Sequence, residues 1–259
     1  MLSWNTLRTF CAVLLLLPIV HLAYLLSSEA LATLDPSPTV WQSEMDAYIR
    51  SDRLQPLPEK PIVVVGGLRV RLWKGLDDLL TPYPVLMRGL GDATVDDIAH
   101  YYKRLIGFYR PRAVVLLPSN SEFHVRDAKS ANELVDGIKS LINLDKDHGT
   151  THRFYIFTPL KTTLFPQDNE KIEKASQLLQ AWAAKLPSVT ILDANRFLTH
   201  GNGSAKPDYF RGDGINLNES GYLRLAMLLQ RQLEQDFGPA SASQVPLLYS
   251  LQDPNSSSQ

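Results

Sequence analysis

The chain has 259 residues, of which 44% are hydrophobic and 20% are charged, and its net charge is −1 at pH 7. This composition is typical of a globular protein, and no cluster of lysine and arginine provides the basic face that nucleic-acid binding requires. The only cysteine is Cys11, which excludes a disulfide within the chain. The length allows one α/β domain with an N-terminal extension.

An apolar run from Phe10 to Leu26 is interrupted only by Pro18 and His21. Arg8 precedes the run and acidic residues follow it, a charge order typical of an N-terminus that stays in the cytoplasm. The run is short for a membrane-spanning helix and long for the core of a signal peptide. An uncleaved anchor, a signal peptide cleaved after Ala30–Ala32, and a buried soluble helix therefore all stay open. Either of the first two exports the domain.

The rest of the chain divides by composition. Four prolines between residues 33 and 60, with Pro61 directly after them, predict a linker that contains one short helix around Trp41–Ile49. The tail, residues 238–259, is rich in serine, glutamine and proline and is predicted to be disordered. We therefore expect a signal anchor or signal peptide over residues 1–32, the linker over 33–60, and a folded domain over 61–237. In a Gram-negative bacterium this domain would face the periplasm from the inner membrane.

Within the folded domain, short apolar runs alternate with amphipathic stretches. Helical spacing of apolar residues predicts helices over 95–109, 134–142, 172–182 and 222–233, with Thr94–Asp97 as a capping pair and Asn218 as an N-cap. The apolar runs are nearly continuous, as in parallel strands that are buried on both faces. The predicted strands are Ile62–Val65, Val85–Met87, Ala113–Leu117, Phe154–Phe157 and Val189–Leu192.

This alternation predicts a three-layer α/β/α sandwich with a central parallel sheet of about five strands, in a flavodoxin-like arrangement, preceded by the N-terminal hydrophobic helix. Functional sites in such sheets form at the C-terminal ends of the strands. We therefore expect the loops 66–71, 88–93, 118–123, 158–163 and 208–216 to lie together.

Two segments at opposite ends of the domain carry a family resemblance. Val63–Trp73 reads V-V-V-G-G-L-R-V-R-L-W, and Asp213–Tyr222 reads D-G-I-N-L-N-E-S-G-Y. These resemble the first block, G-S-S-S-I-R-L-W, and the last block, D-G-L-H-L-N-E-x-G-Y, of the SGNH (GDSL-like) hydrolases, especially the platelet-activating-factor-acetylhydrolase-like branch. The resemblance places the serine nucleophile at Leu68 and the catalytic histidine at Asn216, and it retains the acid as Asp213.

Two middle segments resemble the remaining blocks of that family. Arg88–Thr94 resembles R-G-F-G-G-S-T, which implies a backbone oxyanion donor at Asp92 or, after a shift of one residue, at Gly91. Leu117–Glu122 resembles A-G-E-N-D, which places the oxyanion asparagine at Ser121, one residue from Asn120. The resemblance covers most of residues 60–235 and implies an esterase, whereas the residues at the key positions argue against one.

Leucine cannot attack a carbonyl carbon, and an asparagine amide does not accept a proton near neutral pH. Our first hypothesis is therefore a membrane-anchored, exported protein that has lost catalysis and binds an envelope saccharide, an acylated saccharide or an envelope protein. The alternatives are an esterase of envelope esters with a rearranged site, using Ser119 or Ser121 with Asp213, and a structural envelope protein whose cleft is filled. No pattern indicates a cofactor or a metal site. The candidate ligand-binding residues are Arg69, Gly91, Ser119, Asn120, Ser121, Glu122, Asp213 and Asn216.

Overall fold

The computed structural model describes residues 14, 16–24, 37–124, 128–149, 151 and 153–238. Of the apolar run near the N-terminus, residues 16–24 are helical, and the remainder lies outside the described residues apart from Leu14. Within the described part of the chain, no helix is both long enough and apolar enough to cross a membrane. The predicted disordered tail lies outside the described residues beyond Gly238.

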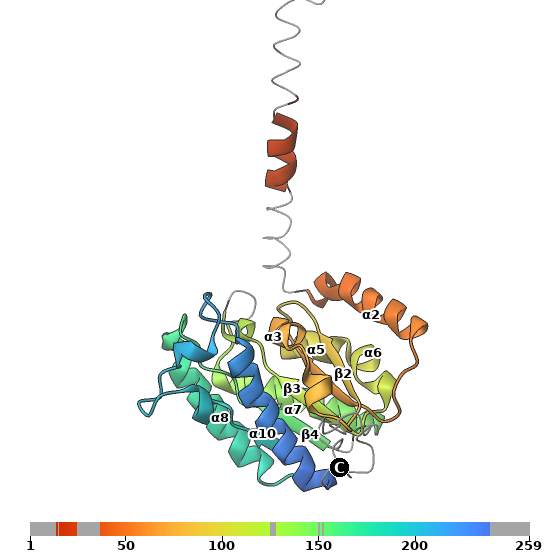
Figure 1. The fold of residues 1–259 in the computed structure, drawn as a ribbon, viewed down its shortest axis with the longest axis vertical. Coiled ribbons are helices and arrows are strands. Elements are labelled where there is room, and N and C mark those ends of the chain that lie inside the picture. Colours follow the sequence, from red (N-terminus) through yellow and green to blue (C-terminus); the bar gives the residue numbers. More distant parts are fainter. Residues whose placement is uncertain are drawn as a thin grey trace, which may run out of the picture.

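Five parallel strands form a single sheet in the order β2-β1-β3-β4-β5 (Figure 1). This confirms the predicted parallel sheet. The two central strands β1 and β3 are buried at every position, as their continuous apolar runs predict. The strands are β1 (Ile62–Gly66), β2 (Val85–Gly89), β3 (Ala113–Leu117), β4 (Arg153–Phe157) and β5 (Val189–Leu192).

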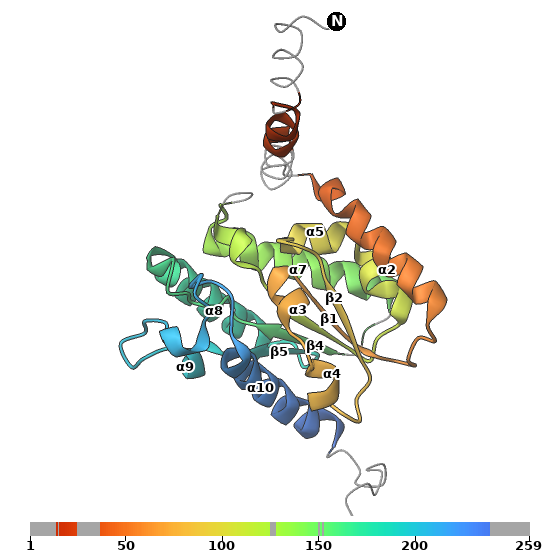
Figure 2. The ribbon, with the colours of Figure 1, turned by 45° about the horizontal axis from the view of Figure 1, so that its top comes forward.

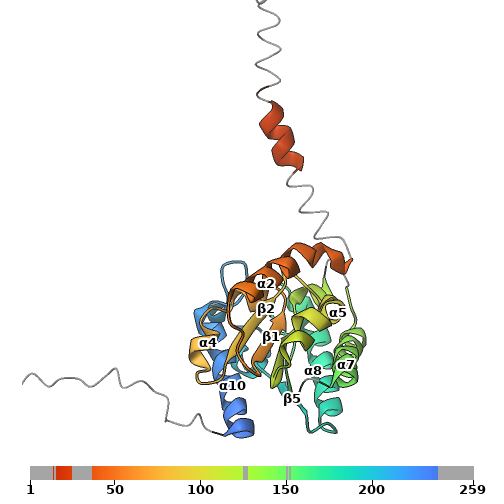
Figure 3. The same ribbon diagram turned by 90° about the vertical axis from the view of Figure 1, so that its right-hand side faces the viewer.

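Helices cover both faces of the sheet (Figures 2 and 3). Alternate side chains along each strand enter two separate cores, because successive strand residues point to opposite faces. One core is covered by α5 (Val95–His100), α6 (Tyr102–Leu105), α7 (Ala131–His148) and α8 (Asn169–Ala183). The other is covered by α3 (Leu68–Leu72), α4 (Leu76–Leu79), α9 (Asn195–Leu198) and α10 (Glu219–Phe237).

The helix caps predicted from sequence are present. Thr94 and Asp97 form a capping box at the start of α5, and the Asn218 side chain accepts a hydrogen bond from the Gly221 N–H at the start of α10. The helix predicted over 95–109 differs, because the chain turns between α5 and α6 and again before the short 3₁₀ helix η2 (Gly107–Tyr109). The helical spacing of apolar residues continues through both turns because α5, α6 and η2 all contribute side chains to the same core.

The segment predicted as a linker with one short helix holds a longer helix, α2 (Gln42–Leu54), which follows the 3₁₀ helix η1 (Pro38–Trp41) and packs on the domain. Met45 of α2 is buried in the core, and the Tyr48 hydroxyl donates a 2.7 Å hydrogen bond to the Gly89 carbonyl at the end of β2. Because β2 is an edge strand, α2 covers a sheet edge that would otherwise present unpaired backbone groups.

A buried polar cluster fastens α2 to β2. The Arg88 guanidinium lies between the rings of Tyr48 and Tyr109, 4.9 and 4.7 Å from their centroids. It forms a 2.6 Å ion pair with Asp52 of α2, whose other carboxylate oxygen accepts a short hydrogen bond from Tyr109. Burial raises the pKa of Tyr109 to about 12, so its hydroxyl remains a donor. This cluster makes α2 part of the folded domain.

Candidate functional site

The loops after β1, β2 and β3 meet at Gly67. A Cβ atom added there would lie 3.0 Å from the Ser119 hydroxyl oxygen and 3.1 Å from the carbonyl oxygens of Gly91 and Ala93. A methyl group at this position would therefore require these neighbouring atoms to shift by a few tenths of an ångström. The strand-end loops that carry three of the four sequence blocks thus lie together, as parallel strands require.

Leu68 is the first residue of α3 and is half-buried at this junction. It stands where the resemblance places the nucleophile. Its side chain has no atom that can form a bond to a carbonyl carbon or bind a proton. The position therefore supplies apolar surface and no nucleophile.

Arg69, the next residue, joins the loops of the site. Its side chain is almost completely buried, and its Nη2 donates to the Asn120 side chain at 3.3 Å and to the Ile215 carbonyl at 3.0 Å. Its Nε is buried without an acceptor in the described residues. Burial lowers the pKa of Arg69 to about 10, although Tyr222, Asp213 and Asp92 act in the opposite direction, so the guanidinium stays charged at neutral pH.

Asp213 and Asn216, which stand where the resemblance places the acid and the histidine, are hydrogen-bonded to each other. One Asp213 carboxylate oxygen accepts from the backbone N–H groups of Ile215 and Asn216 at 2.9 and 2.8 Å. The other accepts from the Asn216 side-chain amide at 2.8 Å. These bonds from Asn216 and Ile215 outweigh the desolvation of the carboxyl and lower the pKa of Asp213. The acid is therefore held as a carboxylate, but its partner cannot carry a proton between atoms.

Glu44 of α2 is a site residue that the sequence reasoning missed. Its carboxylate accepts a 2.9 Å hydrogen bond from the Gly91 N–H and forms a 2.9 Å ion pair with Arg71. Gly91 N–H is one of the two backbone groups that the second block marks as an oxyanion donor. A carboxylate already bound there would repel a second negative charge. The only sequence signal was the predicted short helix, which gave no indication that it contacts the strand ends.

The third block contributes polar groups that are only partly available. The Ser119 hydroxyl bonds the Ser121 hydroxyl at 3.1 Å, and Asn120 and Ser121 are half-buried. Glu122, predicted to contact a ligand, is instead fully buried and accepts from the Val95 N–H at 2.6 Å and from Lys129 at 2.8 Å. Burial raises the pKa of Glu122 to about 7. Both carboxylate oxygens have protein partners, so Glu122 belongs to the scaffold that starts α5.

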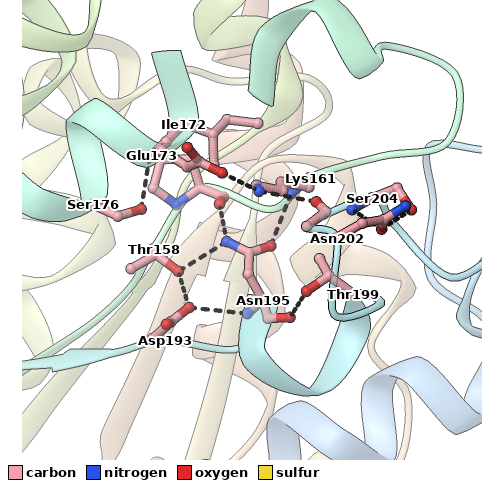
Figure 4. A network of polar contacts seen from close by, with 12 residues as sticks. Thr158, Lys161, Ile172, Glu173, Ser176, Asp193, Asn195, Thr199, Asn202 and Ser204 are labelled. Carbon is pink, nitrogen blue, oxygen red and sulfur yellow. Dashed lines mark hydrogen bonds and ion pairs between the residues drawn. The ribbon is translucent and has the colours of Figure 1, made fainter. Parts of the chain in front are cut away.

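The loop after β4 is held by Asn195, which the sequence did not single out (Figure 4). The Asn195 side chain accepts from the Lys161 N–H at 2.9 Å and donates to the Pro159 carbonyl at 2.8 Å. Lys161 in turn forms a 2.5 Å ion pair with Glu173 of α8. Further along this loop, the N–H of Thr163 donates to the Gly214 carbonyl at 3.1 Å. The network therefore fixes the turn that carries Asp213.

His124, at the end of the third block, pairs with the Asp168 carboxylate and packs on the Phe165 ring at a centroid distance of 4.0 Å. Among the described residues, no hydrogen bond joins a histidine ring to a serine or threonine hydroxyl. Nor does any group of three or more histidine, cysteine, aspartate or glutamate side chains in that part of the chain have the arrangement of a metal site.

No protein-family model and no curated protein matches the sequence. Solved structures do match the fold. A GDSL-like lipase from Bacteroides thetaiotaomicron has a TM-score of 0.62 at 17% identity, covering 74% of this chain and 98% of the other. A lipase/acylhydrolase from Enterococcus faecalis has a TM-score of 0.57 at 14% identity, covering 68% and 96%.

A carbohydrate esterase of family 3 from Talaromyces cellulolyticus is similar at a TM-score of 0.55 and 14% identity, covering 67% of this chain and 97% of the other. Nearly the whole length of each of these proteins is therefore represented in this chain. The chain has the fold of the SGNH, or GDSL-like, hydrolases, as its four sequence blocks predicted.

Proposed function

We propose that this protein is an exported, membrane-anchored member of the SGNH-like fold that binds a ligand without hydrolysing it. The observation that carries the proposal is the Asp213–Asn216 pair, in which an amide takes the place that a catalytic base requires. Leu68 at the start of α3 and Glu44 on the Gly91 N–H support the same conclusion. In this proposal the nucleophile is replaced by Leu68, the base is replaced by Asn216, and the Gly91 N–H is occupied by Glu44.

The proposed ligand is an envelope saccharide or an acylated saccharide, bound at the strand-end loops. Several polar side chains in these loops are exposed or half-buried, and they include both hydrogen-bond donors and hydrogen-bond acceptors. Arg69 adds a buried cation whose Nε lacks an acceptor, which is a group that a ligand oxygen would stabilise. An envelope protein is the second proposed partner. The residues that would contact the ligand are Arg69, Gly91, Ser119, Asn120, Ser121, Asp213 and Asn216.

Ligand binding should raise the thermal stability of the full chain, because a ligand that binds only the folded state stabilises it by mass action. At a hundredfold excess over Kd the gain is about 2.7 kcal/mol. Differential scanning fluorimetry against envelope glycans and acyl-glycans measures the expected rise in Tm. Asp213→Ala and Asn120→Ala should each abolish the shift while the unliganded protein stays folded.

The matched control is Asp208→Ala, an exposed acid in the same loop region that should leave the ligand shift intact. If the shift survives in Asp213→Ala and Asn120→Ala, the ligand binds elsewhere. If no glycan shifts the wild-type Tm, small-molecule binding is contradicted, and crosslinking from position 69 in native membranes then tests the protein partner.

Export is proposed from the apolar run at Phe10–Leu26 and the charge order around it. A C-terminal reporter that is active only outside the cytoplasm should therefore be active in the full-length fusion. Alkaline carbonate washing should leave an anchored protein in the membrane fraction. Full release into the soluble fraction would contradict the anchor in favour of a cleaved signal, and an inactive reporter would contradict export altogether.

A hydrolase with a rearranged site is the second candidate function. The close contact between His124 Nε2 and the Asp168 carboxylate favours it, because an imidazole beside a carboxylate is the pairing that a general base uses, although Nε2 makes no hydrogen bond within the described residues. The third block also carries Ser119 and Ser121, but their hydroxyls bond each other rather than the imidazole. Labelling of either serine by an active-site probe would separate this candidate from the binding protein.

A further inference from the structure

A cavity of about 370 Å³ lies on the α10 side of the sheet, apart from the residues of the proposed ligand cleft. Its walls come from the end of α3, from α4, from the last-block loop and from the first turns of α10. If each non-hydrogen atom takes about the volume of a water molecule, ~30 Å³, the cavity has room for about ten to twelve such atoms. It is lined by Leu72, Trp73, Lys74, Leu79, Arg211, Glu219, Tyr222 and Leu223.

The lining is apolar on its walls and cationic at its edge. Leu79 and Leu223 keep 44% and 46% of their surface exposed, which places unburied aliphatic surface beside the cavity. Lys74 and Arg211 are both exposed, and neither forms an ion pair within the described residues. Glu219 is the only acid among the lining residues, so cations outnumber acids two to one.

Polar chemistry inside the cavity is limited. The Tyr222 hydroxyl donates to the Arg69 carbonyl at 2.8 Å, and burial raises the pKa of Tyr222 to about 12, so this hydroxyl is neither free nor charged at neutral pH. The Tyr222 ring stacks on the Trp73 indole at a centroid distance of 5.6 Å. Trp73 and Tyr222 are only 2% and 6% exposed, so their rings form a rigid floor beneath the cavity, and the Trp73 Nε1–H is buried without an acceptor in the described residues.

From this combination we infer a second ligand site, specific for an aliphatic monocarboxylate of about eight carbons. The alkyl chain lies against Trp73, Tyr222 and Leu223, and the carboxylate lies at the edge near Lys74 and Arg211. Unpaired cations beside apolar walls fit a ligand with one anionic end and one aliphatic end. A neutral or cationic ligand of the same length lacks this charge complementarity. The site does not depend on the proposed ligand cleft.

The test is a titration of the full chain, in nanodiscs of zwitterionic lipid, with butanoate, hexanoate, octanoate and decanoate by isothermal calorimetry. Empty nanodiscs correct for partition into lipid. Each buried methylene should tighten binding about fourfold, so octanoate should bind about two-hundredfold more tightly than butanoate. The gain in affinity per added methylene should cease by decanoate, once the cavity is full. Octylamine should bind at least tenfold more weakly than octanoate.

Variants separate the two ends of the site. Lys74→Gln with Arg211→Gln should weaken octanoate and butanoate by the same factor, because the charge contact is common to both. Leu223→Ala should instead reduce the gain per methylene. Matched controls on the same helix, Met227→Ala and Arg224→Gln, belong to a neighbouring hollow and should change neither quantity.

Several outcomes would overturn the inference: affinity independent of chain length, equal binding of octylamine, or loss of binding in the Met227→Ala control. If the protein does not bind octanoate but sediments with anionic vesicles, the residues around the cavity contact a membrane surface instead. Asn120→Ala, which lies in the proposed ligand cleft and does not line this cavity, should leave octanoate binding unchanged. Failure of this site and failure of the proposed ligand cleft are therefore observed separately.

Discussion

The full-length protein should hydrolyse short acyl esters of 4-nitrophenol no faster than buffer does. Removal of the nucleophile or the base alone costs a serine hydrolase on the order of 10⁶ in rate, and Leu68 and Asn216, which the resemblance places at these two positions, lack the reactive groups. Hydrogen bonds from Asn216 and Ile215 also lower the pKa of Asp213, which makes this carboxylate a weaker base toward a serine proton. A continuous absorbance assay, with a GDSL-like lipase as the positive control, gives sufficient range to detect this difference.

Two sets of variants make the kinetic result interpretable. Wild-type turnover that disappears in Ser119→Ala or Ser121→Ala would identify a rearranged hydrolase and contradict the proposal. The single change Leu68→Ser should remain inactive, because no histidine then accepts the serine proton. Leu68→Ser combined with Asn216→His and Glu44→Gln restores nucleophile and base and removes the carboxylate from the Gly91 N–H. We expect turnover above background from this triple variant.

Asp52→Ala should destabilise the domain by about 3–5 kcal/mol, since it leaves Arg88 buried without its ion-pair partner. Both side chains are about nine-tenths buried, with exposed fractions of 9% and 11%, so solvent cannot replace the lost carboxylate cheaply. The Tyr109 hydroxyl loses its acceptor in the same change. Chemical denaturation of the full chain, with circular dichroism as the signal, measures the free energy of unfolding.

The control is Glu44→Gln, at the other end of α2, where the ion pair with Arg71 is partly exposed, at 46% for Arg71 and 28% for Glu44, and contributes at most about 1 kcal/mol. A loss below about 1 kcal/mol in Asp52→Ala would mean that α2 is a peripheral linker, as the sequence predicted. Replacing Arg88 and Asp52 together by Met and Leu should recover part of the loss, because an apolar pair leaves no buried charge unpaired.

The sheet and its helices could be predicted because their signals are local. Continuous apolar runs marked β1 and β3, and side-chain caps marked the starts of α5 and α10. The role of α2 could not be predicted in this way. The prolines on either side of α2 and its modest apolar content resemble a linker, and its attachment depends on contacts with Arg88 and Gly91 far along the chain.

The site was partly predictable for the same reason. The last block located Asp213 and Asn216 three positions apart, but the sequence did not predict that the Asn216 amide bonds that carboxylate. The position of Glu122 in the third block suggested a ligand contact, but its burial against Lys129 and the Val95 N–H depends on the packing of α5. Whether a side chain at a strand end faces the cleft or the core is decided by such tertiary contacts.

The most direct test of the central claim is a fluorophosphonate probe, which bonds covalently to any serine that is activated as a nucleophile. The full-length protein is incubated with the probe, and its intact mass is measured. We predict an unchanged mass, because no serine in the described strand-end loops has a histidine bonded to its hydroxyl. A stoichiometric adduct on one serine, abolished when that serine is changed to alanine, would contradict the account.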